Sequence, residues 1–329
     1  MTLRIVPLGG LGEIGMNCLA IEQPDGILVV DAGITFPHQD LGVDVYHPDF
    51  SWLDQHADRV VGVFLTHGHE DHVGALPYLL EHLDVPVFGP PHALAMAKRR
   101  LVEHDFASHD LDLHEVRAGS LTRVGPFEVE AIRVSHSIVE ASALCIETAE
   151  GFVVHTGHFT FDDAPPDGEP ADVARLEAIG SRGVELLLSD STNVDTPERA
   201  GSERGVGAAL EPIVSQAPAR VVIALFASNV QRLISLGGIA ARTGRRIALL
   251  GRSLTTQREI ASAIGRLKWP SNLLVAPEEI KNVPRDQLIL LAGGTQAEPN
   301  SAMSRLASGA HPHLTLDSGD SVVFSSRVI

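Results

Sequence analysis

The sequence predicts an α/β protein of two domains, and three observations support this. Its 329 residues exceed the ~250–300 residues at which a single hydrophobic core usually divides. Residues 1–195 are rich in short apolar runs that are typical of strands, whereas from about residue 200 strand-like and helix-like segments alternate. Such alternation favours a parallel sheet covered by helices. We therefore expect domains at 1–195 and 196–329, divided by the polar, turn-rich segment 192–204.

The first part reads mainly as strands. They are expected at 3–8, 18–22, 27–31, 60–66, 127–134, 143–147 and 152–156. Segment 73–83, which follows the fourth of these, has apolar residues at helical spacing and predicts a helix.

The second part predicts alternating helices and strands. Helices are expected at 206–214, 230–242 and 255–267, and strands at 221–225, 246–250 and 287–291. This order predicts parallel strands joined by helical crossovers.

Composition narrows the class of protein. Hydrophobic residues at 44% and charged residues at 20% are typical of a globular domain. The longest apolar runs, such as 221–227, are far shorter than the ~20 residues that span a bilayer, so no membrane partner is expected. No signal peptide is recognisable at the start. Cys18 and Cys145 show no C-x-x-C spacing, which favours a reducing compartment, the cytoplasm.

The net charge of −17 is unevenly distributed. Residues 1–195 carry 10 Lys and Arg against 32 Asp and Glu, whereas residues 196–329 carry 15 against 10. Most cations of the second part are arginines, which suit phosphate groups. The asymmetry therefore fits a second part that meets a polyanion, and equally fits a first part with a solvated acidic surface.

The segment from Phe64 to Ala75 concentrates candidate metal ligands. His67, His69, Asp71 and His72 lie in the turn between the strand at 60–66 and the helix at 73–83. Imidazole and carboxylate are ligands that zinc prefers. His67 and His69 can project the same way, while Asp71 and His72 point to a neighbouring position, as two-metal hydrolysis requires. The alternative is a polar turn without a metal, and the zincin motif H-E-x-x-H is absent.

Other histidines are less informative. His136 follows the strand at 127–134 and is a candidate to complete the site, although a lone histidine at a strand end is more often structural. The remaining histidines are expected on the surface; they are His38, His47, His56, His82, His92, His104, His109, His114, His311 and His313.

The segment from Gly10 to Gly15 matches the dinucleotide-binding pattern G-x-G-x-x-G. That fingerprint requires a helix directly after the glycines, whereas residues 16–31 predict two strands and a turn. We therefore interpret the glycine segment as a tight turn beside the site.

Several motifs resemble one known family in the same order along the chain. They are PLGGLGEIGMN at 7–17, DAGITFP at 31–37, THGHEDHVGALPYLL at 66–80, HSI at 136–138, HTG at 155–157, LSDSTN at 188–193, FASN at 226–229, GRS at 251–253 and DSVVFSS at 320–326. Together they resemble the β-CASP nucleases of the metallo-β-lactamase fold, and most closely bacterial ribonuclease J.

The resemblance implies a four-layer αββα sandwich with an inserted α/β β-CASP domain. It also implies two zinc ions and hydrolysis of single-stranded RNA, endonucleolytically or from the 5′ end, by a homo-oligomer or with a sister subunit. The positively biased second part would carry the RNA backbone.

The resemblance also implies roles for particular residues. His67, His69 and His136 would hold one metal, and Asp71 and His72 the other. Asp31 would orient ligand histidines. Asp71 and Asp190 would act in catalysis, while Ser228 and Asn229 would face the RNA.

Two departures from the family shape a second hypothesis. The family has an aspartate that bridges both metals where this chain has His158, whereas His155 is expected to be structural. A neutral imidazole offers one lone pair per nitrogen, so His158 would hold one metal but not bridge two in the same way. The chain also ends at Ile329, inside an expected strand and before two histidines of the family. These departures suggest a catalytically impaired paralogue that binds RNA or a partner subunit; a small-molecule hydrolase is a third possibility.

Overall fold

The computed structural model describes residues 3–37, 42–197, 200–296 and 298–326. The chain forms two compact units. The first contains Met1–Phe161 and Pro170–Ala200, and the second contains Asp162–Glu169 and Gly201–Ile329. A short segment that precedes the expected boundary thus belongs to the second unit. The expectations for His38 and for a strand reaching Ile329 fall on residues outside the described ones.

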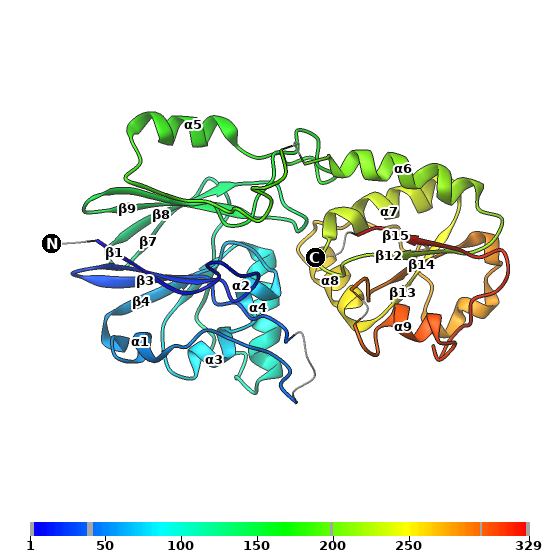
Figure 1. The fold of residues 1–329 in the computed structure, drawn as a ribbon, viewed down its shortest axis with the longest axis horizontal. Coiled ribbons are helices and arrows are strands. Elements are labelled where there is room, and N and C mark those ends of the chain that lie inside the picture. Colours follow the sequence, from blue (N-terminus) through cyan, green and yellow to red (C-terminus); the bar gives the residue numbers. More distant parts are fainter. Residues whose placement is uncertain (1–2, 38–41, 198–199, 297, 327–329) are drawn as a thin grey trace. The chain divides into compact units, whose positions relative to one another are not determined.

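The first unit has two sheets packed face to face (Figure 1). One has the order β1-β2-β3-β4-β5-β6, with β1 Arg4–Gly9, β2 Cys18–Gln23, β3 Gly26–Val30, β4 Val60–Phe64, β5 Val87–Gly89 and β6 Leu113–Glu115. The other has the order β11-β10-β9-β8-β7, with β7 Leu121–Val124, β8 Phe127–Arg133, β9 Ser142–Thr148, β10 Gly151–His155 and β11 Leu186–Leu188. Buried side chains from both sheets, such as Phe64 and Phe127, form the core between them.

Helices cover the outer faces of both sheets. They are α1 Ser51–Asp54, α2 Glu70–Val73, α3 Leu76–Leu80, α4 Pro91–Glu103 and α5 Val173–Arg182, with a 3₁₀ turn η1 at Ala57–Arg59. Figure 1 shows α5 outside the β7–β9 sheet, and α1, α3 and α4 outside the other. The four-layer αββα arrangement expected from the resemblance is confirmed.

The helix expected at 73–83 is wrong in detail. The structure has two short helices, α2 and α3, separated at Gly74 and Ala75. The backbone N–H of Ala75 donates to the carbonyl of Ala32 at 2.8 Å, and a Cβ at Gly74 would lie 2.6 Å from the side chain of Ile34. This junction packs directly against the chain that leaves β3. The apolar spacing reflects burial of both helices and does not require one continuous helix.

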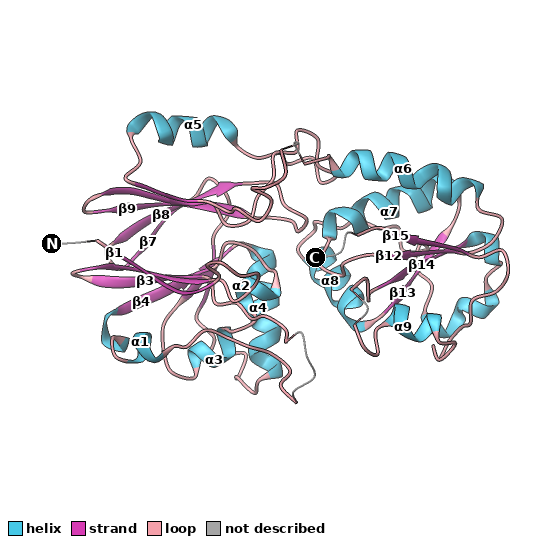
Figure 2. Ribbon diagram, viewed as in Figure 1, coloured by secondary structure: helices cyan, strands magenta, loops and turns pink. Residues whose placement is uncertain are grey.

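The second unit contains a fully parallel sheet with the order β13-β14-β12-β15, which confirms the predicted alternation. Its strands are β12 Val221–Ala224, β13 Arg246–Leu250, β14 Leu288–Ala292 and β15 Ser321–Phe324. Its helices are α6 Glu203–Gln216, α7 Val230–Thr243, α8 Arg252–Ala263 and α9 Ala302–Ala307, with 3₁₀ segments η2 Pro277–Asn282 and η3 Arg285–Gln287. Figure 2 shows helices on both faces of this sheet, α6 and α7 on one and α9 on the other.

Many arginines of the second unit are engaged within the unit. Carboxylate partners are present for Arg220, Arg232, Arg242, Arg266 and Arg285. Arg245 and Arg246 donate to backbone carbonyls. The cationic excess that the sequence shows is therefore partly used to hold this unit together.

The Arg220–Asp320 ion pair joins the two residues that directly precede β12 and β15. The Arg220 Nη2 donates to Asp320 Oδ2 at 2.7 Å, and the Asp320 side chain is 2% exposed. Burial opposes ionisation of Asp320, but hydrogen bonds from Arg220, Arg285 and the Asp317 backbone lower its pKa to about 2. The carboxylate is thus more acidic in the folded chain than in the unfolded one.

We expect this shift to make the second unit sensitive to acid. Because the folded pKa is depressed, its stabilisation of about 2–3 kcal/mol is present above pH ~4 and is lost as the pH falls toward 2. Asp320→Asn should therefore lower the free energy of unfolding at pH 7 and remove this pH dependence, measured by urea unfolding across the range. Glu259→Gln, an exposed change on α8, should leave the profile intact. Equal profiles for wild type and Asp320→Asn would contradict this assignment.

Within the described part of the chain, none of the helices combines the length and apolar character that crossing a bilayer requires.

Candidate metal centre

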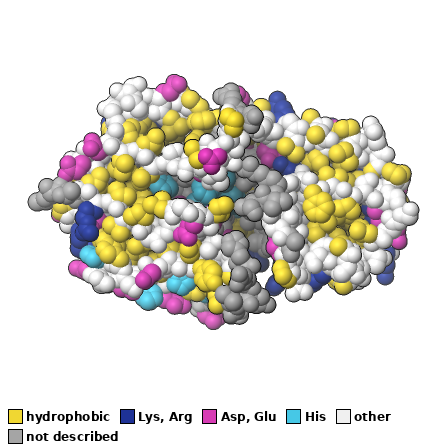
Figure 3. Space-filling view, in the orientation of Figure 1, with side chains coloured by type: hydrophobic (Ala, Val, Ile, Leu, Met, Phe, Trp, Pro, Cys, Tyr) yellow, Lys and Arg dark blue, Asp and Glu magenta, His cyan; other side chains and the backbone are white. Residues whose placement is uncertain are grey.

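The candidate ligands lie just beyond the ends of strands in the first unit. His67 and His69 follow β4, Asp71 and His72 lie in α2, His136 follows β8, and His158 follows β10. Figure 3 shows histidine side chains gathered in a recess of the first unit. Residues more than 60 positions apart in sequence therefore meet at one place, as expected for strand ends that share an edge of a sandwich.

One group of ligand atoms comes from His67, His136 and His158, which lie within 4.8 Å of one another. His69 lies beside it, with its Nδ1 at 3.1 Å from the Nε2 atoms of both His67 and His136. The predicted trio of His67, His69 and His136 thus converges, with His158 as a fourth imidazole. Four nitrogen donors in such an arrangement suit a tetrahedral divalent ion.

A second group contains Asp71, His72 and His158, whose ligand atoms also lie within 4.8 Å of one another. The Asp71 Oδ2 is 3.4 Å from His72 Nε2 and 4.0 Å from His158 Nδ1. His158 is therefore the shared member of both groups, which is where the resemblance places the bridging ligand.

Asp31 is a buried carboxylate that holds the ligand loop in place. Its backbone has a positive φ of 60° directly after β3. The Thr66 N–H donates to Oδ1 and the Thr66 hydroxyl to Oδ2, each at 2.8 Å, and His72 Nδ1 lies 2.7 Å from Oδ2. One buried carboxylate thus fixes both the start of the ligand loop and the ring of His72.

Asn17 and Gly33 position the same loop, and sequence reasoning gave neither a role. The Asn17 Nδ2 donates to the carbonyl and to Oδ2 of Asp71, both at 3.1 Å. A Cβ at Gly33 would lie 1.6 Å from the Asp71 carbonyl oxygen, so only glycine allows this backbone approach. Both residues belong to motifs quoted above, and motif membership was the only available signal.

Burial and charge set the protonation of the ligands. Burial, together with neighbouring histidines, holds the pKa of His67 and of His136 well below the ordinary value, so both rings are neutral and offer lone pairs. Burial also opposes charge on His72, but the Asp31 and Asp71 carboxylates raise its pKa to about 10. Burial opposes ionisation of Asp71, yet His72 lowers the pKa of that carboxyl far below its usual range.

This donor set fits a divalent metal. Neutral imidazoles and an ionised carboxylate are the protonation states that ligation requires. The His72 Nδ1–H can remain on Asp31 while Nε2 faces the site, which is the usual arrangement of a metal-bound histidine.

We expect metal binding to release about one proton per chain at pH 7.5. Because its pKa is raised to about 10, His72 is protonated on both ring nitrogens at pH 7.5 in the metal-free protein. The Nε2 atom must lose its proton to become a ligand. Calorimetric titration of the metal in two buffers with different ionisation heats measures this number. Binding without proton release would show that His72 is not a ligand.

Asp190 and His155 both make hydrogen bonds with neighbouring residues of the first unit. The Asp190 backbone N–H donates to the Thr156 hydroxyl at 3.0 Å, and its Oδ1 accepts from the Thr192 N–H at 2.8 Å. Asp190 is not a member of either ligand group among the described residues. His155 accepts a hydrogen bond from the Gly157 N–H at 3.2 Å, in keeping with a structural role.

Ser228 and Asn229 lie in the loop between β12 and α7 of the second unit. The Asn229 Oδ1 accepts from the Arg232 N–H at 2.8 Å and caps α7. Its Nδ2 faces Glu203 at 3.4 Å. Asn229 therefore stabilises the conformation of this loop.

His92 corrects one expectation. The sequence places it on the surface, but its side chain is fully buried in α4. A Cβ at Gly68 would lie 2.5 Å from its Nδ1, so its ring packs against the ligand loop. Local sequence gave no signal of this, because the contact joins segments that are distant in the chain.

Comparisons with known proteins agree with the fold described above. Residues 11–224 match the model of the metallo-β-lactamase superfamily, and residues 218–329 match the model described as "Ribonuclease J, beta-CASP domain". Ribonuclease J of Helicobacter pylori is 37% identical over 100% of this chain and 48% of its own length. Ribonuclease J of Mycobacterium tuberculosis is 39% identical over 99% of this chain and 58% of its own length. The chain thus spans about half the length of these curated relatives.

A solved structure shares the fold. The crystal structure of a protein of unknown function from Enterococcus faecalis superposes with a TM-score of 0.67 at 16% identity, covering 99% of this chain and 88% of that one. The likeness concerns the fold alone, whereas the family models and curated relatives carry the assignment. The chain belongs to the metallo-β-lactamase superfamily and carries, in residues 218–329, a β-CASP domain of the ribonuclease J type.

Proposed function

We propose that this chain belongs to a zinc-dependent ribonuclease that hydrolyses phosphodiester bonds of single-stranded RNA. The observation that carries the proposal is the convergence of the two ligand groups in a chain whose curated relatives are named ribonuclease J. Cleavage within the RNA and cleavage from its 5′ end are both compatible with this site. We propose residues 1–195 as the domain of the metal centre and residues 196–329 as the domain that contacts RNA.

His67, His69 and His136 would hold one ion, Asp71 and His72 the other, and His158 would contact either. Divalent ions bound there supply charge stabilisation and a nucleophile at neutral pH. Asp31 keeps the His72 ring oriented, and Asn17 fixes the Asp71 carboxylate. We propose Asp71 and Asp190 as the catalytic carboxylates. Burial and His72 lower the pKa of His158, and the carboxylates of Asp71 and Asp190 oppose this lowering, which supports a place for Asp190 beside the site.

The RNA path would use Ser228 and Asn229, which lie after β12 at the carboxyl edge of the parallel sheet. Ligands of open α/β sheets bind at this edge. The phosphates would meet Arg204, Arg252, Arg258, Lys268 and Arg305, which have no ion-pair partner among the described residues. We further propose a homo-oligomer or a sister subunit as partner. The cysteines are free and buried, which supports the cytoplasm as location.

A second candidate function is a catalytically impaired paralogue that binds RNA or a partner subunit. It is favoured by one observation, the imidazole of His158 at the position shared by both ligand groups. A neutral ring contributes no negative charge to a site for two dications. This candidate predicts RNA binding with little cleavage.

Cleavage of a 5′-monophosphorylated single-stranded RNA tests the proposal. We expect hydrolysis that requires a divalent metal and that falls at least about 100-fold in His67→Ala, because a ligand matters more than its supporting residues. His109→Ala is the matched control, since this side chain is 84% exposed and lies outside both groups. Wild-type binding without cleavage would favour the paralogue. Equal cleavage by wild type and His67→Ala would refute the assigned site.

A further inference from the structure

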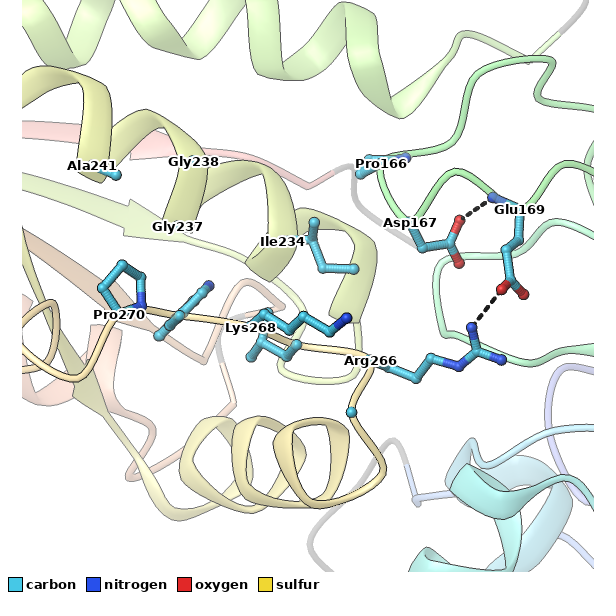
Figure 4. Close-up of a pocket in the computed structure, with 13 residues that line it drawn as sticks. Pro166, Asp167, Glu169, Ile234, Gly237, Gly238, Ala241, Arg266, Lys268 and Pro270 are labelled. Carbon is cyan, nitrogen blue, oxygen red and sulfur yellow. Dashed lines mark hydrogen bonds and ion pairs between the residues drawn. The ribbon is translucent and has the colours of Figure 1, made fainter.

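A cavity of about 580 Å³ lies within the second unit, and none of its lining residues belongs to either ligand group. One face of α7, including Ile234 and Gly237, forms its floor, and the loop after α8 with Lys268 and Trp269 forms a wall. The segment Asp162–Glu169 forms another wall through Asp167 and Glu169 (Figure 4). We call this cavity the Trp269 pocket. Its volume lies in the usual range of about 300–1,000 Å³ for small-molecule sites.

Specific bonds hold the walls of the Trp269 pocket in place. The buried Gln231 side chain binds Asp167 twice, with its Nε2 donating to Oδ2 at 2.6 Å and its Oε1 accepting from the backbone N–H at 3.1 Å. Arg266 Nη1 donates to Glu169 Oε1 at 2.6 Å and ties the two loops together. The pocket is therefore preformed, which lowers the entropic cost of binding a ligand.

The indole of Trp269 has a fixed position in the pocket, and a glycine in α7 makes room for it. Its Nε1–H donates to the Leu233 carbonyl at 3.2 Å. A Cβ at Gly237 would lie 2.0 Å from Nε1, so a glycine in the middle of α7 makes room for the ring. Glycine there weakens the helix relative to alanine. The half-buried indole thus occupies a defined position against α7.

The charges of the Trp269 pocket leave one cation available. Asp167 is engaged by Gln231, and Glu169 by Arg266. Lys268 is exposed and has no ion-pair partner among the described residues. Figure 4 shows Lys268 extending below Ile234 toward the side of the pocket with Arg266. The lining of the pocket therefore combines one ammonium group with an indole, prolines and aliphatic side chains.

We propose that the Trp269 pocket binds a nucleotide, with the base against Trp269 and the phosphate on Lys268. A planar aromatic ring that stacks and carries one negative group matches this combination of an indole and an ammonium group. The nucleotide could be a unit of single-stranded RNA or a free mononucleotide. The first source rests on the proposed function and would give the RNA a contact point in the second unit.

Tryptophan fluorescence tests this proposal on the full chain. The sequence has two tryptophans, so Trp52→Phe leaves Trp269 as the sole reporter. The probes are uridine monophosphate and an eight-nucleotide oligouridylate with phosphorothioate linkages, which resist hydrolysis. We expect quenching by base stacking. Tighter binding of the oligouridylate identifies RNA as the source, whereas equal affinity on a nucleotide basis identifies the free nucleotide.

Variants separate the two contacts. Trp269→Ala should weaken oligouridylate binding about 5- to 150-fold, the usual range for loss of one stacked base. If it fails to fold, Trp269→Phe should retain binding better than Trp269→Leu in a fluorescently labelled oligouridylate assay. Lys268→Ala should weaken binding and reduce the slope of log K against log salt by about 0.7. Lys281→Ala, an exposed lysine of the same unit outside the pocket, should do neither.

Several results would overturn the proposal. One is the absence of quenching with both probes; if the same protein cleaves RNA, the proposed function stands while the pocket assignment fails. Equal effects of Lys268→Ala and Lys281→Ala would show non-specific charge alone. A change in Trp269 emission with protein concentration, and not with nucleotide, would identify a second copy of the chain as the occupant.

Discussion

Asp31→Ala is expected to destabilise the first unit by about 3–5 kcal/mol and to weaken metal binding at least tenfold. Asp31 is 1% exposed, and its two oxygens contact both Thr66 and His72. Without this carboxylate, the buried N–H and hydroxyl of Thr66 lose their acceptor and the His72 ring loses its orientation. Both losses act on the loop that carries the other ligands.

Urea unfolding and metal competition with a chelator measure these effects. Asp25→Ala is the matched control, because Asp25 is exposed in the turn between β2 and β3. Asp31 would not have the assigned supporting role if Asp31→Ala kept its metal affinity and its free energy of unfolding lay within about 1 kcal/mol of the control.

His158→Asp is expected to raise the affinity for the second metal ion at least tenfold and to increase RNA cleavage. His158 is the shared member of both ligand groups, with Nδ1 at 4.0 Å from Asp71 Oδ2. An aspartate there adds one negative charge and two oxygens that can contact two ions, whereas a neutral imidazole has a single free lone pair and can ligate only one ion. The gain is therefore specific to a carboxylate.

His158→Ala distinguishes addition of a carboxylate from removal of the imidazole. We expect this variant to bind metal no better than wild type. Metal titration followed by native mass spectrometry counts the ions in each variant. If His158→Asp and His158→Ala gave the same stoichiometry and affinity, the shared position would not be a bridging one.

The sequence predicted those parts of the fold whose signal is local. The strands at β2, β3, β4 and β13 are short buried apolar runs, and each lies within a residue or two of its expected place. The histidines and Asp71 after β4 could be recognised as candidate metal ligands because they lie close together in one turn. The alternation of the second unit followed from apolar periodicity alone.

Features that depend on distant contacts were not predictable. The break between α2 and α3 is set by packing against Ala32 and Ile34. The assignment of Asp162–Glu169 to the second unit depends on its contacts with that unit, among them those made by Gln231 and Arg266. Counting charges also could not show that Arg220 and Arg232 form ion pairs within the unit, because their partners, Asp320 and Glu203, are distant in the sequence.

The most direct test of the account is the zinc content of purified protein after dialysis against metal-free buffer. We predict zinc bound to the wild-type chain and to His109→Ala, and its loss from His67→Ala, because His67 belongs to the first ligand group. A wild-type chain that takes up no zinc, or a His67→Ala variant with the same zinc content as wild type, would contradict the proposed metal centre.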